Sequence, residues 1–172
     1  MIPTTVKIVQ KGVGFTTQEW QPILAEAFKH AGQFWHRNIL PKHFTVAGAQ
    51  EYGYRERTKG YLEKKMHMFG HQRPLVFTGD MKREVTRIID VRVTGRAHKT
   101  AADIVLHGPT HMFYARKNIQ WEGDMWSVAR ELAKVSQKDA DLVSEVIARN
   151  IEKQLRRSTK VRDITRGHRV AA

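Results

Sequence analysis

The sequence predicts an α+β fold: a long N-terminal helix packed on a small antiparallel sheet, two C-terminal helices and a basic C-terminal arm. Apolar residues recur at helical spacing over residues 16–40 and again over residues 125–157. Between them, over residues 88–114, apolar and polar residues alternate with the period of two that is typical of strands. A similar alternation over residues 4–10 predicts one further short strand.

The first helix is predicted over residues 16–40, where large apolar residues form a stripe at helical spacing. Thr16 and Glu19 have the spacing of a capping box, which satisfies free amide groups at a helix start. Pro22 also fits a start about one turn later, because a proline in the first turn forfeits no hydrogen bond. Pro41 is expected to end the helix. We interpret the apolar stripe as core packing, with a partner-binding face as the alternative.

The middle of the chain is predicted to alternate short elements with loops. Residues 45–53 contain two glycines and indicate a loop or extended chain. Residues 57–69 predict a short helix that presents its lysines to solvent and ends at Gly70. Residues 75–77 predict a brief strand, and residues 81–88 a short charged helix.

Three strands are expected next. The alternation from residue 88 continues to residue 93 and is broken by Gly95, and a second alternation covers residues 102–107. A third extended segment is predicted over residues 112–114. Short connections of this kind favour an antiparallel meander with one face packed on the long helix.

Two helices are predicted in the last third of the chain. The first covers residues 125–135, with its apolar residues on one side. The second starts at Ser136, because Asp139 follows three residues later as in a helix cap, and it ends in Arg156 and Arg157.

Composition bounds the broad class. A chain of 172 residues suits one domain, which we place at residues 1–157, with the basic arm over residues 158–172. The absence of cysteine excludes disulfides and thiolate metal sites. The N-terminus lacks the pattern of a secretion signal and no run of about 18 apolar residues occurs, so we expect a soluble protein that is not exported.

The charge of the chain indicates a polyanionic neighbour. The formal net charge is +13, and the isoelectric point is about 10.3. Close to half of this excess lies within residues 153–169, which hold seven Lys and Arg residues and one acidic residue. Such a charge attracts nucleic acid or an acidic protein surface. The basic arm is either a solvated tail or a segment that orders against DNA or an acidic partner.

No residue pattern indicates catalysis, a cofactor or a metal. His67 and His71 are four residues apart, as are His107 and His111, but neither pair has the intervening glutamate or third ligand of a zinc motif. The serines lack a nucleophile elbow, and the acidic residues are scattered rather than clustered. We therefore predict that the chain is not an enzyme and that it has no catalytic, cofactor-binding or metal-binding residues.

The stretch from His43 to Val85 carries the main indication of function. It contains an aromatic and basic segment, a helix with a lysine pair, Pro-Leu-Val at 74–76, Thr-Gly at 78–79 and a short charged helix. This order resembles the small neck and tail-completion proteins of tailed bacteriophages.

The resemblance implies a structural virion protein, made in the host cytoplasm and located in the phage neck or tail. It implies a closed ring of sixfold or twelvefold symmetry that joins the tail to the head connector. The implied partners are portal or adaptor proteins and tail-tube or terminator proteins, with non-specific contact to genomic DNA and no membrane.

Two groups of residues are candidates for these contacts. The first group, predicted at a subunit interface because tyrosine and arginine favour such surfaces, is Tyr52, Tyr54, Arg55, Arg57 and Tyr61. The alternative for this group is a well-packed surface loop with its arginines stacked on its tyrosines. The second group, predicted to face DNA or an acidic partner, is Lys59, Lys64, Lys65, Arg156, Arg157, Lys160, Arg162, Arg166 and Arg169.

Three other functions fit the composition. A sequence-independent DNA-binding protein would contact phosphates only, since the chain has no convincing base-reading element. A metal-free basic ribonuclease toxin would use histidine and lysine. A cytoplasmic assembly chaperone would share the fold and be absent from finished particles.

Overall fold

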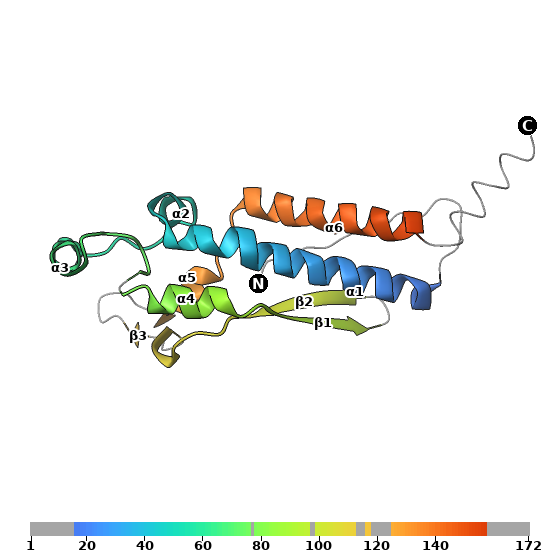
Figure 1. Ribbon diagram of the computed structural model, residues 1–172, viewed down its shortest axis with the longest axis horizontal. Helices are drawn as coiled ribbons and strands as arrows, with labels where there is room; N and C mark the ends of the chain where they lie inside the picture. Colours follow the sequence, from blue (N-terminus) through green and yellow to red (C-terminus); the bar gives the residue numbers. More distant parts are fainter. Residues whose placement is uncertain (1–15, 77, 97–98, 113–115, 118–124, 158–172) are drawn as a thin grey trace, which may run out of the picture.

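The computed structural model describes residues 16–76, 78–96, 99–112, 116–117 and 125–157. In this part of the chain, helix α1 (Thr17–Phe34) lies between helix α6 (Gln137–Arg157) and a hairpin of strands β1 (Asp90–Arg96) and β2 (Lys99–Val105) (Figure 1). The predicted α+β class is therefore confirmed. The strand predicted over residues 4–10 and the basic arm lie outside the described residues.

Helix α1 starts where the capping box predicts. The Thr16 hydroxyl accepts a hydrogen bond from the Glu19 amide at 3.4 Å, and the Glu19 carboxylate accepts one from the Thr16 amide at 2.7 Å. These bonds fix the first turn at Thr17, so the later start that Pro22 permitted is wrong.

The helical path does not stop at Pro41. After α1 the chain makes a π-helical turn, η1 (Trp35–Ile39), and then a 3₁₀ helix, η2 (Leu40–Phe44). Pro41 falls in the first turn of η2, where its missing amide hydrogen costs little. The extra helical turns bury apolar residues of η1 and η2 in the main core, whose buried members are Trp35, Ile39, Leu40, Phe44, Val76, Val85, Met112 and Leu132.

Two of the middle elements differ from the prediction. Residues 46–51 form a short helix, α2 (Val46–Glu51), because the Thr45 hydroxyl caps it by accepting from the Gly48 amide at 3.0 Å. Residues 75–76 are not a strand: Leu75 lies in a turn with a φ of 52°. Two other elements are confirmed: helix α3 (Lys59–Phe69), which ends at the left-handed Gly70, and helix α4 (Asp80–Arg87).

The sheet that packs on α1 is a two-stranded hairpin among the described residues; the third predicted strand is not formed at Met112, and residues 113–114 lie outside the described residues. Strands β1 and β2 pair from Asp90 opposite Val105 to Arg96 opposite Lys99, so Gly95 lies within the ladder rather than ending it. Met112 belongs to a 3₁₀ turn, η3 (Thr110–Met112). One face of the hairpin packs on α1, as predicted.

The predicted first C-terminal helix is shortened by a second ladder. Strand β3 (Arg116–Lys117) pairs with β4 (Met125–Trp126), and helix α5 (Val128–Leu132) follows. Helix α6 begins as predicted, with the Ser136 hydroxyl accepting from the Asp139 amide at 3.2 Å. It packs on α1 through a second apolar cluster, centred on Ala27, Ala31 and Ile147. None of the helices in the described ranges is both long and apolar enough to span a membrane.

Gly32 sets how closely α1 approaches β1. A Cβ at this position would lie 2.7 Å from Cγ1 of Val91, whose β-branched side chain has little freedom to move. By contrast, a Cβ at Gly60 in α3 would meet no atom within 4 Å among the described residues.

We predict that Gly32→Ala lowers the free energy of unfolding by about 1–3 kcal/mol through overpacking, although alanine favours a helix. Gly60→Ala should raise it by up to about 1 kcal/mol. Urea unfolding of both variants measures this, and Gly32→Ala with Val91→Ala should recover part of the loss. A stabilising Gly32→Ala would show that α1 and β1 are not in this contact.

Candidate interaction surfaces

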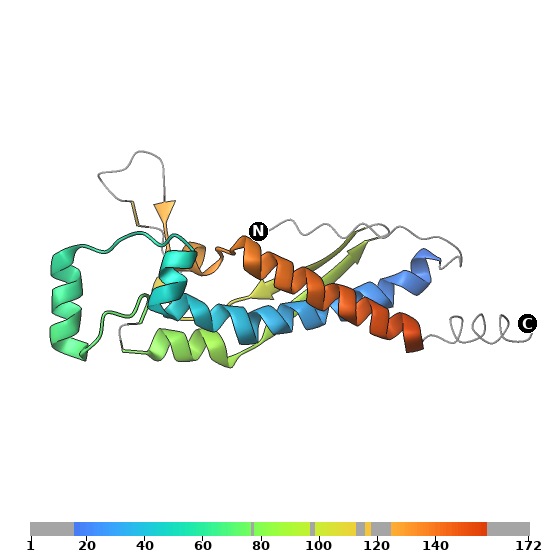
Figure 2. The same ribbon diagram turned by 90° about the horizontal axis from the view of Figure 1, so that it is seen from above.

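Helix α3 projects from the rest of the protein. Figures 1 and 2 both place it at one end of the molecule, clear of α1, α6 and the hairpin. We call residues 54–76, which leave the body, form α3 and return, the arm. The arm begins within the Tyr and Arg segment that was predicted at a subunit interface. The contacts at the base of the arm therefore decide which of these side chains pack inside the protein and which face solvent.

The base of the arm is an aromatic stack. The rings of His43 and Tyr52 are stacked at 3.8 Å with an angle of 4° between their planes. The Tyr54 hydroxyl is hydrogen-bonded to Nδ1 of His43. The ring of Trp35 is tilted against that of His43, with their centroids 6.1 Å apart. The segment that enters the arm is therefore held by η2 of the body.

A buried carboxylate ties this stack to α6. Asp139 is 0% exposed and accepts hydrogen bonds from the Tyr52 hydroxyl at 2.6 Å, the Lys42 ammonium at 2.7 Å and the Ser136 hydroxyl at 3.0 Å. Burial by itself would raise the pKa of Asp139, but these three hydrogen bonds together lower it. The group therefore remains an anion inside the protein.

A second ion pair secures the arm on α5. Arg57 donates to the buried Glu131 at 2.7 Å. The other carboxylate oxygen of Glu131, Oε1, has no hydrogen-bond partner among the described residues. Nearby, the Lys134 ammonium donates to the carbonyl of Gly53 at 2.6 Å. Arg57 therefore pairs with an acid of its own chain.

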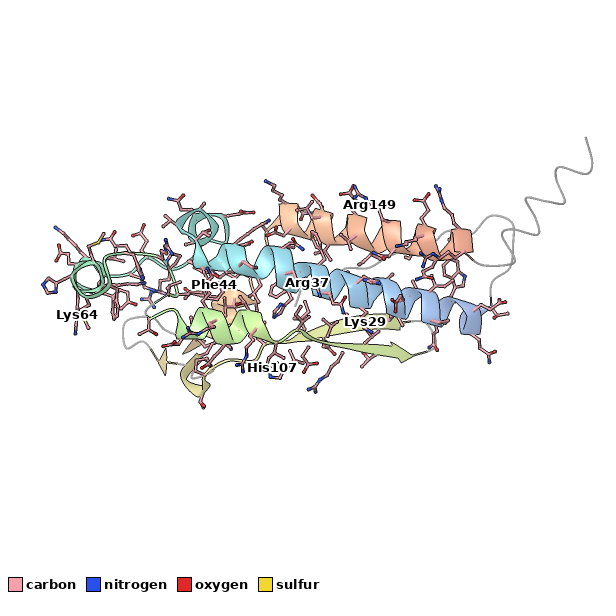
Figure 3. The ribbon with its side chains drawn as sticks, viewed as in Figure 1. Lys29, Arg37, Phe44, Lys64, His107 and Arg149 are labelled. Carbon is pink, nitrogen blue, oxygen red and sulfur yellow. The ribbon has the colours of Figure 1, made fainter. Side chains whose placement is uncertain are left out.

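The lysines of α3 do not all face solvent. Lys65 is 2% exposed, and its ammonium donates to the carbonyl of Arg73 in the returning segment. Burial, with the charge of Arg57 nearby, lowers the pKa of Lys65. The prediction that this helix presents its lysines to solvent is wrong for Lys65 and right for Lys59 and Lys64. Figure 3 shows Lys64 at the outer end of the molecule.

Three large apolar side chains of α3 are exposed: Tyr61 at 40%, Met66 at 46% and Met68 at 53%. Of the predicted interface residues, Tyr61 and Arg55 are exposed, Tyr54 is half-buried, and Tyr52 and Arg57 are engaged inside the protein. Sequence reasoning missed Met66 and Met68, for which the only signal was a pair of methionines on a strongly basic helix.

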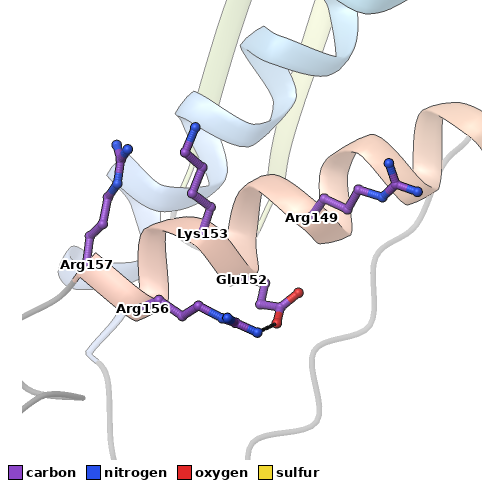
Figure 4. A pocket seen from close by; sticks show the side chains of 5 residues that line it. All are labelled: Arg149, Glu152, Lys153, Arg156 and Arg157. Atoms are coloured by element: carbon purple, nitrogen blue, oxygen red, sulfur yellow. Dashed lines mark hydrogen bonds and ion pairs between the residues drawn. The ribbon is translucent and has the colours of Figure 1, made fainter.

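The end of α6 carries a separate, purely charged surface. A shallow hollow of about 440 Å³ is lined by Arg149, Glu152, Lys153, Arg156 and Arg157 (Figure 4). Arg149 pairs with Glu145 at 2.5 Å, and Arg156 pairs with Glu152. Of the basic residues predicted to face DNA or an acidic partner, Arg156 and Arg157 lie here. Lys160, Arg162, Arg166 and Arg169 lie outside the described residues.

No cluster of three or more potential metal ligands occurs in the part of the chain that is described. His107 instead pairs with Asp90 at 3.0 Å, and the ring of His71 lies 6.4 Å from that of Phe69. Comparison of the chain with known protein families, with curated proteins and with solved structures finds no match.

Removal of one hydroxyl group tests the buried carboxylate. We predict that Tyr52→Phe lowers the free energy of unfolding by about 1.5–3 kcal/mol, because a hydrogen bond to a buried charge is lost while the ring stack remains. The matched change Tyr61→Phe, on an exposed ring whose hydroxyl has no hydrogen-bond partner in the described chain, should change it by less than about 0.5 kcal/mol. Equal effects in denaturant melts would contradict this account.

Acid should destabilise the base of the arm. Burial lowers the pKa of His43 to about 4 from an ordinary value of 6.5, so folding favours the neutral ring. The stability that the neutral His43 ring contributes is fully present above pH 6.5. It is lost as the pH falls from 6.5 to 4, and the free energy of unfolding decreases by about 3 kcal/mol in total. His36, buried against the carbonyl of Val85, has a pKa lowered by burial and adds in the same direction.

The measurement is the free energy of unfolding at pH 7, 5.5 and 4.5, for the wild type and for His43→Phe. The variant keeps a flat ring against Tyr52 but cannot titrate. Its stability should fall less than that of the wild type over this range. Parallel pH profiles for the two proteins would exclude His43 as the main titrating group.

Proposed function

We propose that this chain is a structural virion protein of a tailed phage, a neck or tail-completion subunit. It forms a closed ring of six or twelve copies that joins the tail to the head connector. Its neighbours are portal or adaptor proteins on one side and tail-tube or terminator proteins on the other. It acts by assembly and turns over no substrate. The resemblance of residues 43–85 to such proteins is the starting point of this proposal.

The observation that carries the proposal is the projecting helix α3 with its exposed Tyr61, Met66 and Met68. Several large exposed apolar side chains on one helix that stands clear of its own core are typical of a surface that a partner covers. Methionine and tyrosine suit that purpose, because one adapts its shape and the other adds large contact area with a polar tip. The arm therefore has the chemistry of a protein contact.

The internal anchoring of the arm favours assembly over a flexible tether. Tyr52 and Arg57 connect the arm to Asp139 and Glu131, which are on α6 and α5. An arm held at a fixed angle presents α3 in one orientation, and a fixed orientation is what a repeated contact needs if a ring is to close. In this proposal the buried tyrosines position the contact surface, while α3 itself supplies it.

Native mass measurement tests the assembly. The full chain of 19.9 kDa should form particles of six or twelve copies. Met66→Glu with Met68→Glu should reduce the assembled fraction at least tenfold and leave the helical content unchanged. The control, Ala47→Glu with Gln50→Glu on the exposed face of α2, adds the same charge and should assemble normally.

Two results would overturn the proposal. A wild-type chain that stays monomeric at every concentration, alone and with the tail and connector proteins of its own phage, would exclude a ring. Absence of the polypeptide from purified particles, measured by mass spectrometry, would instead assign it to the assembly chaperones.

A further inference from the structure

We infer that the outer face of the C-terminal half of α6 binds the phosphate backbone of duplex DNA without reading its sequence. This inference goes beyond the assembly proposed above and does not depend on it, because a monomer would carry the same surface. It rests on the hollow lined by Arg149, Glu152, Lys153, Arg156 and Arg157 (Figure 4).

Two cations of this surface are available to a ligand. Among the described residues, neither Lys153 nor Arg157 has a carboxylate within ion-pair distance, and both are exposed. Figure 4 shows them pointing to the same side of α6. Four residues of helix separate them by about 6 Å along the axis, close to two steps of one DNA strand at about 3.4 Å per step.

The two remaining arginines can join them. Arg149 and Arg156 are held by Glu145 and Glu152 at exposed sites. Exposed pairs of this kind contribute about 0–1 kcal/mol, so a phosphate can replace the carboxylate at little cost. Ligand binding would then engage up to four cations on two turns of one helix.

The chemistry of the surface favours a phosphate backbone over a protein. No large apolar side chain of α6 is exposed, whereas stable protein contacts need an apolar centre. None of the described residues that line the hollow is aromatic and able to stack on an unpaired base, which disfavours single-stranded nucleic acid. Cations without an apolar or aromatic neighbour match the repeating phosphates of a duplex, which offer charge and no exposed base face. The apolar surface of α3 and the charged surface of α6 thus suit different partners.

The experiment measures binding of the full chain to a fluorescent 30-base-pair duplex of arbitrary sequence at several salt concentrations. Lys153→Gln with Arg157→Gln removes two charges at the proposed site. The control, Lys29→Gln with Arg37→Gln, removes one exposed charge of α1 and one of η1, neither of which has an ion-pair partner among the described residues. Both variants keep the basic C-terminal arm over residues 158–172. A difference in binding between them therefore reports the charges of α6 alone.

We expect the α6 variant to bind several-fold more weakly at about 0.15 M salt, with the slope of log K against log salt reduced by about 1.8. The control variant should keep the wild-type slope, and a second duplex of unrelated sequence should bind equally well. Equal losses in both variants, or no loss in the α6 variant, would overturn the inference. So would an oligoglutamate of equal charge that displaces the duplex at a lower concentration, since that would indicate an acidic protein partner. Ring formation is measured separately by native mass measurement of the full chain. Loss of DNA binding and loss of assembly can therefore be told apart.

Discussion

The buried carboxylate of Asp139 is the constraint on which the arrangement of the body and arm depends. It receives hydrogen bonds from Lys42 on η2, from Tyr52 after α2, and from Ser136 at the start of α6. The stretch that holds Lys42 and Tyr52 therefore meets the start of α6, 87 to 97 residues later in the sequence, at one anion. A buried charge is tolerated only when every neighbouring donor is in place, so this site specifies the geometry as well as stabilising it. Because Tyr52 also stacks on His43, the direction in which the arm leaves the body follows from the same contact.

The two ends of the molecule divide the interaction chemistry between them. Helix α3 presents apolar side chains beside Lys59 and Lys64, and it is stabilised from within by the buried Lys65. The far end of α6 presents charged side chains, and no large apolar side chain of this helix is exposed. The net charge of +13 alone could not distinguish these surfaces, because it counts both in one total. Separation of apolar and charged surfaces on opposite ends allows a protein partner and a polyanion to be bound at the same time.

Local signals in the sequence predicted the element boundaries where the determining contacts are also local. The Thr16 and Glu19 capping box, the left-handed Gly70 and the Ser136 cap each act within four residues, and each fixed a helix end as expected. The partners of the arm could not be predicted in this way. Tyr52 and Asp139 are 87 residues apart, and Arg57 and Glu131 are 74 apart. A tyrosine and an arginine in a basic segment look the same in sequence whether they face a neighbouring subunit or an acid of their own chain.

The topology of the arm has a mechanical consequence. The chain leaves the body at Tyr54 and returns to the main core at Val76, so α3 is joined to the body by two connections in parallel. A force applied to α3 is shared between the ion pair at Glu131 on one connection and the packed core on the other. Neither connection bears the whole load, and two attachment points also resist rotation of the helix about the body. A paired attachment therefore holds the orientation of α3 more firmly than a single flexible linker would.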